Sequence, residues 1–208
     1  MNDARGDRPA EPPVTHLLYL HGFRSSPQST KARQTQQWLA EHHPEVQWLC
    51  PQLPPSPREA FALVTDATSD WPLATRAVIG SSLGGYYATG YAERTGCRAV
   101  VLNPAVDPAR DLARYIGEIS AWHSDERFYF RAEYIAELRA LHAPAPSDPQ
   151  RCYAVIAKGD EVLDWREMHA RYAACRIRLL EGGDHALSDY ETAHLPSVLE
   201  FLGLCGAG

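Results

Sequence analysis

Three residues of the sequence have the types and the order that nucleophilic acyl transfer requires. Ser82 is followed along the chain by Asp160 and then by His185. A serine hydroxyl becomes a good nucleophile only when a base removes its proton, and an imidazole can take up and return that proton near neutral pH. A carboxylate beside the imidazole fixes its tautomer and stabilises its positive form. The three side chains therefore predict a Ser–His–Asp catalytic triad.

Ser82 is distinguished as the nucleophile by the glycines around it. An apolar run leads into Gly80-Ser-Ser-Leu-Gly84, which has the pattern G-x-S-x-G. In a strained turn between a strand and a helix, side chains two residues before and after the serine would collide, so glycine is favoured at both places. Ser81 is flanked at those places by isoleucine and leucine. The pattern alone is weak, but the strand-like run before it and the helix-like run after it supply the required context.

Two backbone N–H groups are expected to stabilise the charge that develops on a carbonyl oxygen. Residues 14–20 read as an apolar strand, and they lead into His21-Gly22-Phe23. A sharp turn at Gly22 would point the N–H of Phe23 at the site, and Leu83 directly follows the nucleophile. We therefore expect the N–H groups of Phe23 and Leu83 to form an oxyanion hole. His21 is placed to brace this loop and not to act as the base.

Other acidic residues are weaker candidates for the triad. Asp164 is the main rival, but with Glu167 it forms the pattern of a helix capping box. Asp66 and Asp70 precede the nucleophile, which is the wrong order. Asp184 would have to fold back onto the neighbouring histidine, so a solvated loop carboxylate is expected there.

Several further polar residues are expected at the surface. Glu161 follows the predicted acid and is expected to face solvent. His42 and His43 end a predicted helix, where the helix dipole favours them, and no further ligand stands nearby for a metal. His194 lies within the last predicted helix, which runs from about residue 188 to 202, and is expected on its outer face.

The composition excludes several classes of protein. Apolar residues make up 45% of the 208-residue chain and charged residues 22%, as in an ordinary globular protein. The net charge of −6 gives no basic surface for nucleic acid. No apolar run approaches the ~20 residues of a membrane helix, and residues 1–13 lack the apolar segment of a signal peptide, so a disordered tail is expected there. The five cysteines show no C-x-x-C spacing, which favours reduced thiols in a cytoplasmic protein.

The elements that must position the triad alternate regularly. Six strand-like segments are separated by helical patterns, at residues 14–20, 46–50, 76–80, 98–102, 152–157 and 176–180. This alternation predicts a mostly parallel, doubly wound sheet with helices on both faces. Ser82, Asp160 and His185 each follow a strand, at the edge where such sheets carry their sites. Their order is that of the α/β-hydrolase fold, and residues 14–208 are predicted to form one such domain.

Two regions between the strands carry further expectations. The first helix is expected to begin with Ser26 as N-cap and Pro27 at its first position. Residues 104–150 are less regular and are expected to form a small helical cap over the nucleophile. The aromatic residues of this cap either line an acyl pocket or pack the cap onto the sheet, and both interpretations stay open: Trp122, Phe128, Tyr129 and Phe130.

Several segments of the chain together resemble those of a known family. The segments LLYLHGFRSSPQSTKA, PQLPP, GSSLGGYYAT, NPAV, GDEVLDWR and EGGDHA, in that order, closely resemble the bacterial YqiA-like esterases. The resemblance covers roughly Leu17 to Leu204, and its departures lie in the polar tail and the cap. It implies an α/β-hydrolase fold and carboxylesterase activity on short acyl esters, with acyl-CoA thioesters as a further substrate class. The family's triad falls on Ser82, Asp160 and His185.

The expected function is hydrolysis of small esters. Thioesterase or other acyl hydrolase activity on the same triad is the alternative, and a non-catalytic binding protein that kept the fold is a remote one. No metal-ligand cluster or dinucleotide fingerprint accompanies the triad, so neither metal nor cofactor is expected. The physiological substrate, the acyl length and the oligomeric state do not follow from the sequence.

Overall fold

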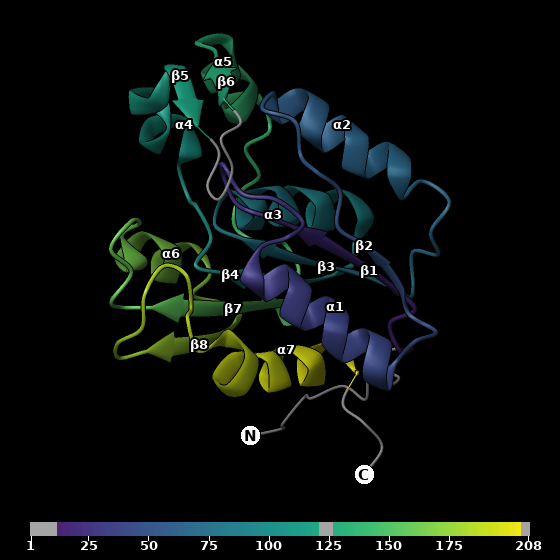
Figure 1. The fold of residues 1–208 in the computed structure, drawn as a ribbon. Coiled ribbons are helices and arrows are strands. Elements are labelled where there is room, and N and C mark those ends of the chain that lie inside the picture. Colours follow the sequence, from purple (N-terminus) through teal and green to yellow (C-terminus); the bar gives the residue numbers. More distant parts are fainter. Residues whose placement is uncertain (1–11, 121–126, 205–208) are drawn as a thin grey trace.

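The fold is built on a six-stranded parallel sheet. The computed structural model describes residues 12–120 and 127–204, so only residues 12 and 13 of the predicted tail lie in the described part. The strands of the sheet are β1 (His16–Leu20), β2 (Gln47–Leu49), β3 (Arg76–Ser81), β4 (Arg98–Leu102), β7 (Cys152–Ala157) and β8 (Arg176–Leu180). They lie in the order β2-β1-β3-β4-β7-β8, and all neighbours are parallel (Figure 1). The predicted sheet is confirmed.

The central strands form because both faces of the sheet are covered. Every residue of β3, β4 and β7 is buried, which suits their nearly continuous apolar sequences. Side chains alternate between two cores: on β1, Leu18 and Leu20 enter one core, whereas Leu17 and Tyr19 enter the other. Because all six strands are parallel, their carboxyl ends lie at one edge of the sheet. The cores on both faces of the sheet hold this edge in place.

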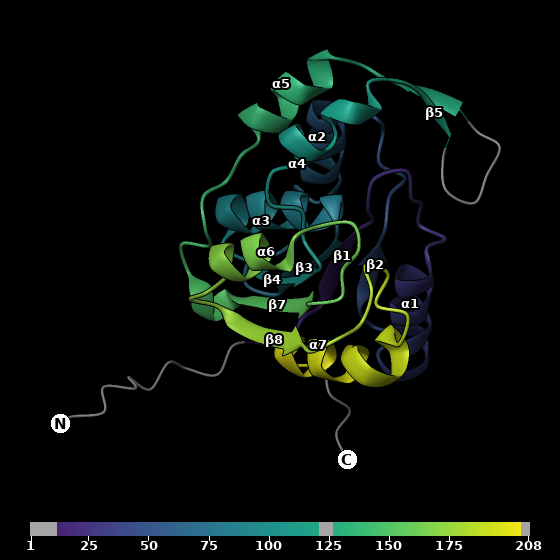
Figure 2. The same ribbon diagram turned by 90° about the vertical axis from the view of Figure 1, so that its left-hand side faces the viewer.

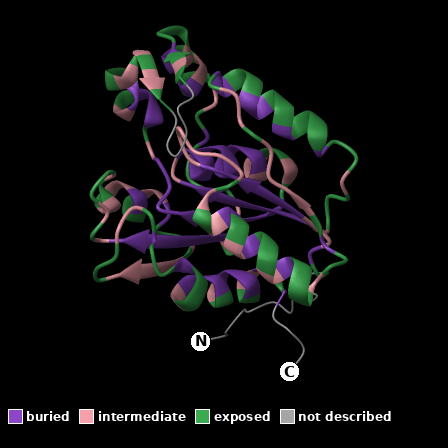
Figure 3. Cartoon of the chain, viewed as in Figure 1, coloured by how far each residue is buried: buried purple, intermediate pink, exposed green. Residues whose placement is uncertain are grey.

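Helices pack on both faces of this sheet (Figures 1 and 2). One face carries α1 (Thr30–His42) and α7 (Leu195–Leu202), and the other carries α3 (Leu83–Thr95) and α6 (Trp165–Arg171), with α2 (Pro57–Ala67) farther out. The helices turn buried residues inward and exposed residues outward (Figure 3). Within the described residues, no helix is long and apolar enough to cross a bilayer.

The segment between β4 and β7 is a mixed cap. It contains α4 (Pro108–Asp111), a 3-10 turn (Ala113–Tyr115), β5 (Gly117–Ser120), β6 (Arg127–Phe130), α5 (Glu133–Ala140) and a second 3-10 turn (Pro149–Arg151). β5 and β6 pair as an antiparallel hairpin that projects from the sheet (Figure 2), and the sequence analysis did not predict it. Tyr129 is 60% exposed and Phe130 is 1% exposed, the alternation of a strand and not of a helix.

Two helix boundaries differ from the sequence prediction. α1 begins at Thr30 and not at Pro27, because residues 26–29 form a separate turn that the N–H of Ser29 closes on the carbonyl oxygen of Ser26. The last helical segment starts with a π-helical turn, Tyr190–His194, before α7. Pro196 in the first turn of α7 lacks an N–H, so a regular α-helix cannot run through this point unbroken.

Candidate active site

Ser82 lies in a sharp turn between β3 and α3. Its backbone has a φ of 56° and a ψ of −121°, a conformation that non-glycine residues seldom adopt. A Cβ at Gly80 would lie 2.2 Å from the carbonyl oxygen of Gly84, and a Cβ at Gly84 would lie 1.9 Å from that of Leu20. Glycine is therefore required at both places, at the first by the turn itself and at the second by the end of β1. Ser81 lies inside β3 and is buried.

His185 lies between Ser82 and Asp160. Its Nε2 is 3.1 Å from the Ser82 hydroxyl, and its Nδ1 is 2.8 Å from one carboxyl oxygen of Asp160. The Asp160 side chain is fully buried, and its other oxygen accepts the N–H groups of Val162 and Leu163, both at 2.8 Å. Since the carboxylate accepts, Nδ1 donates to it, and the lone pair of Nε2 faces the serine hydroxyl. The structure thus brings the three predicted side chains into one hydrogen-bonded row.

Asn103 links the loops behind this row. Its side chain is fully buried, and its Nδ2 donates to the carbonyl oxygens of Asp184 and His185 at 2.9 and 3.2 Å. Its Oδ1 accepts the N–H of Ala157 at 2.8 Å, at the end of the strand that leads to Asp160. Sequence reasoning missed this residue, because a single asparagine after a strand has no local pattern. Its place in the NPAV segment was the only signal.

Glu161 also contacts the histidine loop. Its side chain is exposed, but one carboxyl oxygen accepts the backbone N–H of His185 at 3.0 Å. The prediction that Glu161 simply faces solvent is therefore incomplete. The bond joins two loops that are 24 positions apart, a distance that no local sequence pattern reports.

The rival acids have other partners. Asp164 caps α6 as predicted, by accepting a backbone N–H of that helix at 2.9 Å, but the side chain of Glu167 binds Arg110 and does not complete the predicted capping box. Asp184 accepts the hydroxyl and the N–H of Ser188 at 2.6 and 3.0 Å, and these bonds lower the pKa of its carboxyl group. Asp66 on α2 and Asp70 just beyond it are exposed. None of these rival acids hydrogen-bonds the His185 side chain within the described residues.

The prediction that His194 lies at the surface is wrong. Its side chain is 2% exposed, and its Nε2 is 3.0 Å from a carboxyl oxygen of Asp189. The prediction assumed a regular α-helix through this residue. The π-helical turn that ends at His194 changes the helical phase and turns the imidazole inward.

His21 braces the loop after β1, as expected. Its imidazole is 3% exposed, its Nδ1 is 3.0 Å from the carbonyl oxygen of Gly22, and its Nε2 accepts the N–H of Leu53 at 3.1 Å. Burial lowers the pKa of this imidazole, which suits a neutral ring with one donor and one acceptor nitrogen. A Cβ at Gly22 would lie 3.2 Å from the Cβ of Ser82, so this loop passes directly beside the nucleophile.

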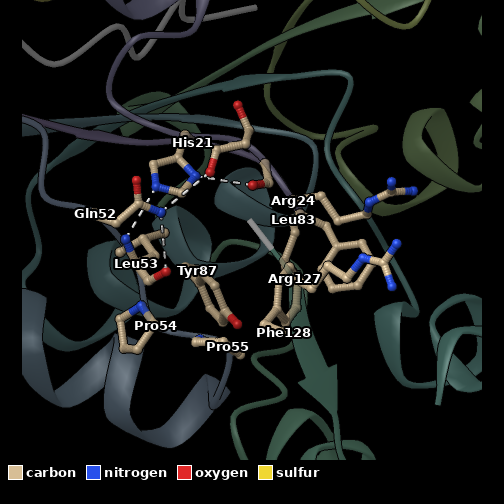
Figure 4. A pocket seen from close by; sticks show the side chains of 13 residues that line it. His21, Arg24, Gln52, Leu53, Pro54, Pro55, Leu83, Tyr87, Arg127 and Phe128 are labelled. Atoms are coloured by element: carbon tan, nitrogen blue, oxygen red, sulfur yellow. Dashed lines mark hydrogen bonds between the residues drawn. The ribbon is translucent and has the colours of Figure 1, made fainter. Parts of the chain in front are cut away.

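The loop formed by residues 21–25 lines two pockets. The larger pocket has a volume of about 480 Å³, and its lining includes Phe23, Leu53, Leu83, Tyr87 and Phe128 (Figure 4). The smaller pocket has a volume of about 230 Å³, and its lining includes Tyr19, Ser29, Lys31, Ser82 and His185. The serine hydroxyl and the imidazole therefore open onto the smaller pocket, and the larger one begins at the residue after the serine.

The cap aromatics do not share one role. Phe128 lines the larger pocket, whereas Phe130 is buried and packs edge-on against Phe23 with ring centroids 5.3 Å apart. Tyr129 faces solvent, and Trp122 lies outside the described residues. Both interpretations of the sequence thus hold, each for a different residue.

One protein family matches nearly the whole chain. Residues 16–203 match the family described as "Uncharacterised protein family (UPF0227)". The chain belongs to this family. The match spans the whole sheet with its cap, and it confirms the resemblance to YqiA-like proteins at the level of the family.

Solved structures show the same fold. Mouse alpha/beta hydrolase domain-containing protein 10 superimposes with a TM-score of 0.69 at 15% identity, covering 90% of this chain and 88% of that one. Est1E from Butyrivibrio proteoclasticus, solved with ferulic acid bound, superimposes with a TM-score of 0.67 at 16% identity, covering 95% of this chain and 89% of that one. The esterase Pf2001 of Pyrococcus furiosus superimposes with a TM-score of 0.61 at 15% identity, covering 92% of this chain and 81% of that one. The predicted α/β-hydrolase fold is therefore confirmed.

The described part of the chain contains no cluster of side chains that could bind a metal ion. Residues 12–120 and 127–204 contain no group of three or more histidine, cysteine, aspartate or glutamate side chains placed to hold an ion.

Proposed function

We propose that the chain is a serine esterase that hydrolyses short-chain carboxylic esters through Ser82, His185 and Asp160. The observation that carries the proposal is the row of hydrogen bonds from the Ser82 hydroxyl through the imidazole to a buried carboxylate. The row stands in a glycine-flanked turn at the carboxyl edge of the sheet, where this fold carries its sites. The structural neighbour from Pyrococcus furiosus is an esterase by name, which supports esters as the substrate class.

The geometry supports acyl transfer in two steps. The Ser82 oxygen attacks the ester carbonyl carbon while Nε2 of His185 takes the serine proton. The tetrahedral intermediate then collapses, the alcohol leaves with that proton, and the acyl group stays on Ser82. Water, deprotonated by the same imidazole, attacks the acyl-enzyme and releases the carboxylic acid. Asp160 stabilises the imidazolium in both steps.

The negative charge on the carbonyl oxygen needs donors that are already in place. We assign this role to the backbone N–H groups of Phe23 and Leu83, which flank Ser82 from the loop after β1 and from the first residue of α3. Neither N–H has a hydrogen-bond acceptor among the described residues, so both can serve the oxyanion. Each such donor contributes roughly 10²–10³ in rate in related chemistry.

A fluorophosphonate probe tests the proposal directly. The serine oxygen displaces fluoride and forms a bond to phosphorus, so the wild-type protein should gain the probe mass on the peptide that contains Ser82. Ser82→Ala should not react, and Ser81→Ala should react like the wild type. A folded wild-type protein that stays unlabelled would show that the chain is a binding protein and not a hydrolase.

A matched substrate panel then separates the acyl hydrolases. Butyrate esters, thioesters and amides with similar leaving groups are compared by kcat/KM. We expect the ester to be hydrolysed best, and EDTA to leave the rate unchanged because each step uses only protein groups and water. A higher kcat/KM on the thioester would instead make the chain a thioesterase on the same triad.

A further inference from the structure

In the proposed reaction, the smaller pocket would hold the alcohol part of the ester. Of the two pockets, His185 lines only this one. The imidazole that takes the serine proton must afterwards deliver it to the leaving oxygen, so the leaving group lies within hydrogen-bond reach of Nε2. The larger pocket, which begins at Leu83, would then hold the acyl part of the ester. What lines the smaller pocket therefore selects the alcohol.

The start of α1 lines this pocket. Ser29, Thr30 and Lys31 are the N-cap and the first two residues of this 13-residue helix, and all three line the pocket. The first N–H groups of a helix have no partner within the helix, and the helix dipole favours an anion in front of them. The Ser29 hydroxyl makes no capping bond, and its oxygen is buried without a hydrogen-bond partner among the described residues.

Tyr19 adds a second buried polar group. It stands on β1 with a side chain that is 0% exposed, and it lines the same pocket. Its hydroxyl makes no well-formed hydrogen bond in the described part of the chain, and the side chain of Ser81, which also lines the pocket, lies close enough to oppose part of the effect of burial on the phenol. Burial raises the pKa of this phenol well above its ordinary value, so the hydroxyl keeps its proton and can donate it. An acceptor in the pocket would satisfy a group that is costly to bury alone.

Lys31 supplies a positive charge. Its Nζ donates to the carbonyl oxygen of Ala186, next to His185, which uses one of its three donors. The carboxylates that face it are Asp184, which is bound to Ser188, and Asp160, which is bound to His185. Burial lowers the pKa of Lys31 to about 8, and the two carboxylates oppose this shift. The ammonium form therefore predominates at neutral pH.

We propose that the smaller pocket binds a carboxylate on the alcohol part of the substrate, so that the preferred substrates are acyl esters of short hydroxy acids. The inference rests on the proposed esterase function. The carboxylate would accept hydrogen bonds from the Lys31 ammonium, from the first N–H groups of α1 and from the Tyr19 hydroxyl. The volume of about 230 Å³ limits the alcohol to a small group, so the charge must lie within a few bonds of the ester oxygen.

Paired esters test this assignment. 3-Acetoxypropanoate and 3-acetoxypropanamide have nearly the same shape and differ in charge. Each kcat/KM is divided by that ester's own rate of hydroxide hydrolysis, which removes intrinsic reactivity. The wild type should prefer the carboxylate by roughly tenfold, the factor that one charge-assisted hydrogen bond supplies. In Lys31→Met this preference should fall to about one.

Control experiments show whether the preference for the anionic ester comes from this pocket or from another positive charge. Lys158→Met removes an ammonium that is bound to Glu181 outside the pocket, and it should keep the wild-type preference. 3-Hydroxypropanoate should inhibit the wild type more strongly than its amide does, a comparison that needs no variant. A wild-type preference of one in a protein that reacts with fluorophosphonate would overturn the carboxylate pocket and leave the esterase proposal standing. A preference that survives in Lys31→Met would overturn the assignment to this pocket.

Discussion

The buried side chain of Asn103 donates a hydrogen bond of 3.2 Å to the carbonyl oxygen of His185. The same amide donates to Asp184 and accepts from Ala157, so it joins the end of β4 to the end of β7 and to the loop that carries the imidazole. Its backbone φ of 41° is positive, a region that asparagine tolerates better than most residues, so an asparagine suits this position. Asn103 therefore positions the proposed base without touching the substrate.

Replacing Asn103 tests this relationship. Asn103→Ala should lower kcat by about 10²-fold with a smaller change in KM, because a displaced imidazole affects the reaction more than binding. Three lost hydrogen bonds should also lower the free energy of unfolding, by roughly 1–3 kcal/mol for each buried group left unpaired. Steady-state kinetics and thermal melting measure the two effects.

A buried threonine away from the site is the matched control for Asn103. Thr68 is fully buried at the end of α2, where it bonds the carbonyl oxygen of Val64 and the hydroxyl of Tyr91, both at 2.8 Å. Thr68→Val should lower the melting temperature and leave kcat at the wild-type value. If Asn103→Ala behaved in the same way, the positioning role would be excluded.

The two neighbouring serines should respond differently. Ser82→Ala should remove nearly all esterase activity, since triad nucleophiles elsewhere contribute on the order of 10⁶ in kcat. Ser81→Ala should retain most activity, because Ser81, although it ends β3 and lines the same pocket, makes no hydrogen bond to the imidazole. Initial rates on a p-nitrophenyl ester measure both variants. An inactive Ser81→Ala beside an active Ser82→Ala would contradict the elbow geometry.

The two aspartates after β7 should separate catalysis from stability. Asp160→Asn should lower kcat/KM by about 10⁴-fold, the effect of losing an orienting carboxylate in a comparable triad. Asp164→Asn keeps an N-cap side chain, so its activity should be unchanged and its stability should change by less than ~1 kcal/mol. Kinetics and melting temperatures are measured for both. A fully active but less stable Asp160→Asn would reverse the assignment.

The preference for an anionic ester should disappear at high pH. Lys31 binds an anion only as an ammonium, and burial lowers its pKa to about 8, so the interaction is present below that pH and is lost as pH rises through it. Asp184 and Asp160 are the carboxylates that face Lys31, and both oppose the effect of burial on its pKa. The kcat/KM ratio for 3-acetoxypropanoate and its amide, measured from pH 6.5 to 9.5, cancels effects on the shared imidazole. A ratio that stays constant would show that Lys31 does not sense the substrate charge.

Acyl length should be limited by the larger pocket. Its lining is largely apolar, and the cap segment beside it is short, so we expect short acyl chains to be preferred over long ones. A series of esters from acetate to palmitate, with one common alcohol, measures this preference. We expect the highest kcat/KM among the short chains. A maximum at twelve carbons or more would mean that the acyl group extends beyond this pocket and would leave the serine mechanism intact.

Local patterns explain which parts could be predicted from sequence. Apolar runs located the six strands, and the glycines around Ser82 located the turn, because each signal lies within a few neighbouring residues. The order of Asp160 and His185 after two strands was enough to bring them together in the prediction, since parallel strands end at one edge.

The missed features depend on contacts between distant segments. Asn103 and Glu161 act through the loop of His185, and neither stands in a pattern that reports its partner. Lys31 reads as an ordinary polar residue of a helix, and only the packing of α1 beside residue 186 brings it to the pocket. The hairpin formed by β5 and β6 was missed because its alternating pattern is only four residues long on each strand.

The residues of the proposed triad are far apart in the sequence, and this separation has a consequence for folding. The hydrogen bond between Ser82 and His185 joins residues 103 positions apart, and the strands that present them are separated in the sheet by β4 and β7. Chains dominated by such distant pairings fold slowly, because the long loops must close before the contacts form. Esterase activity during refolding should therefore return only with the completed sheet, later than helix content measured by circular dichroism.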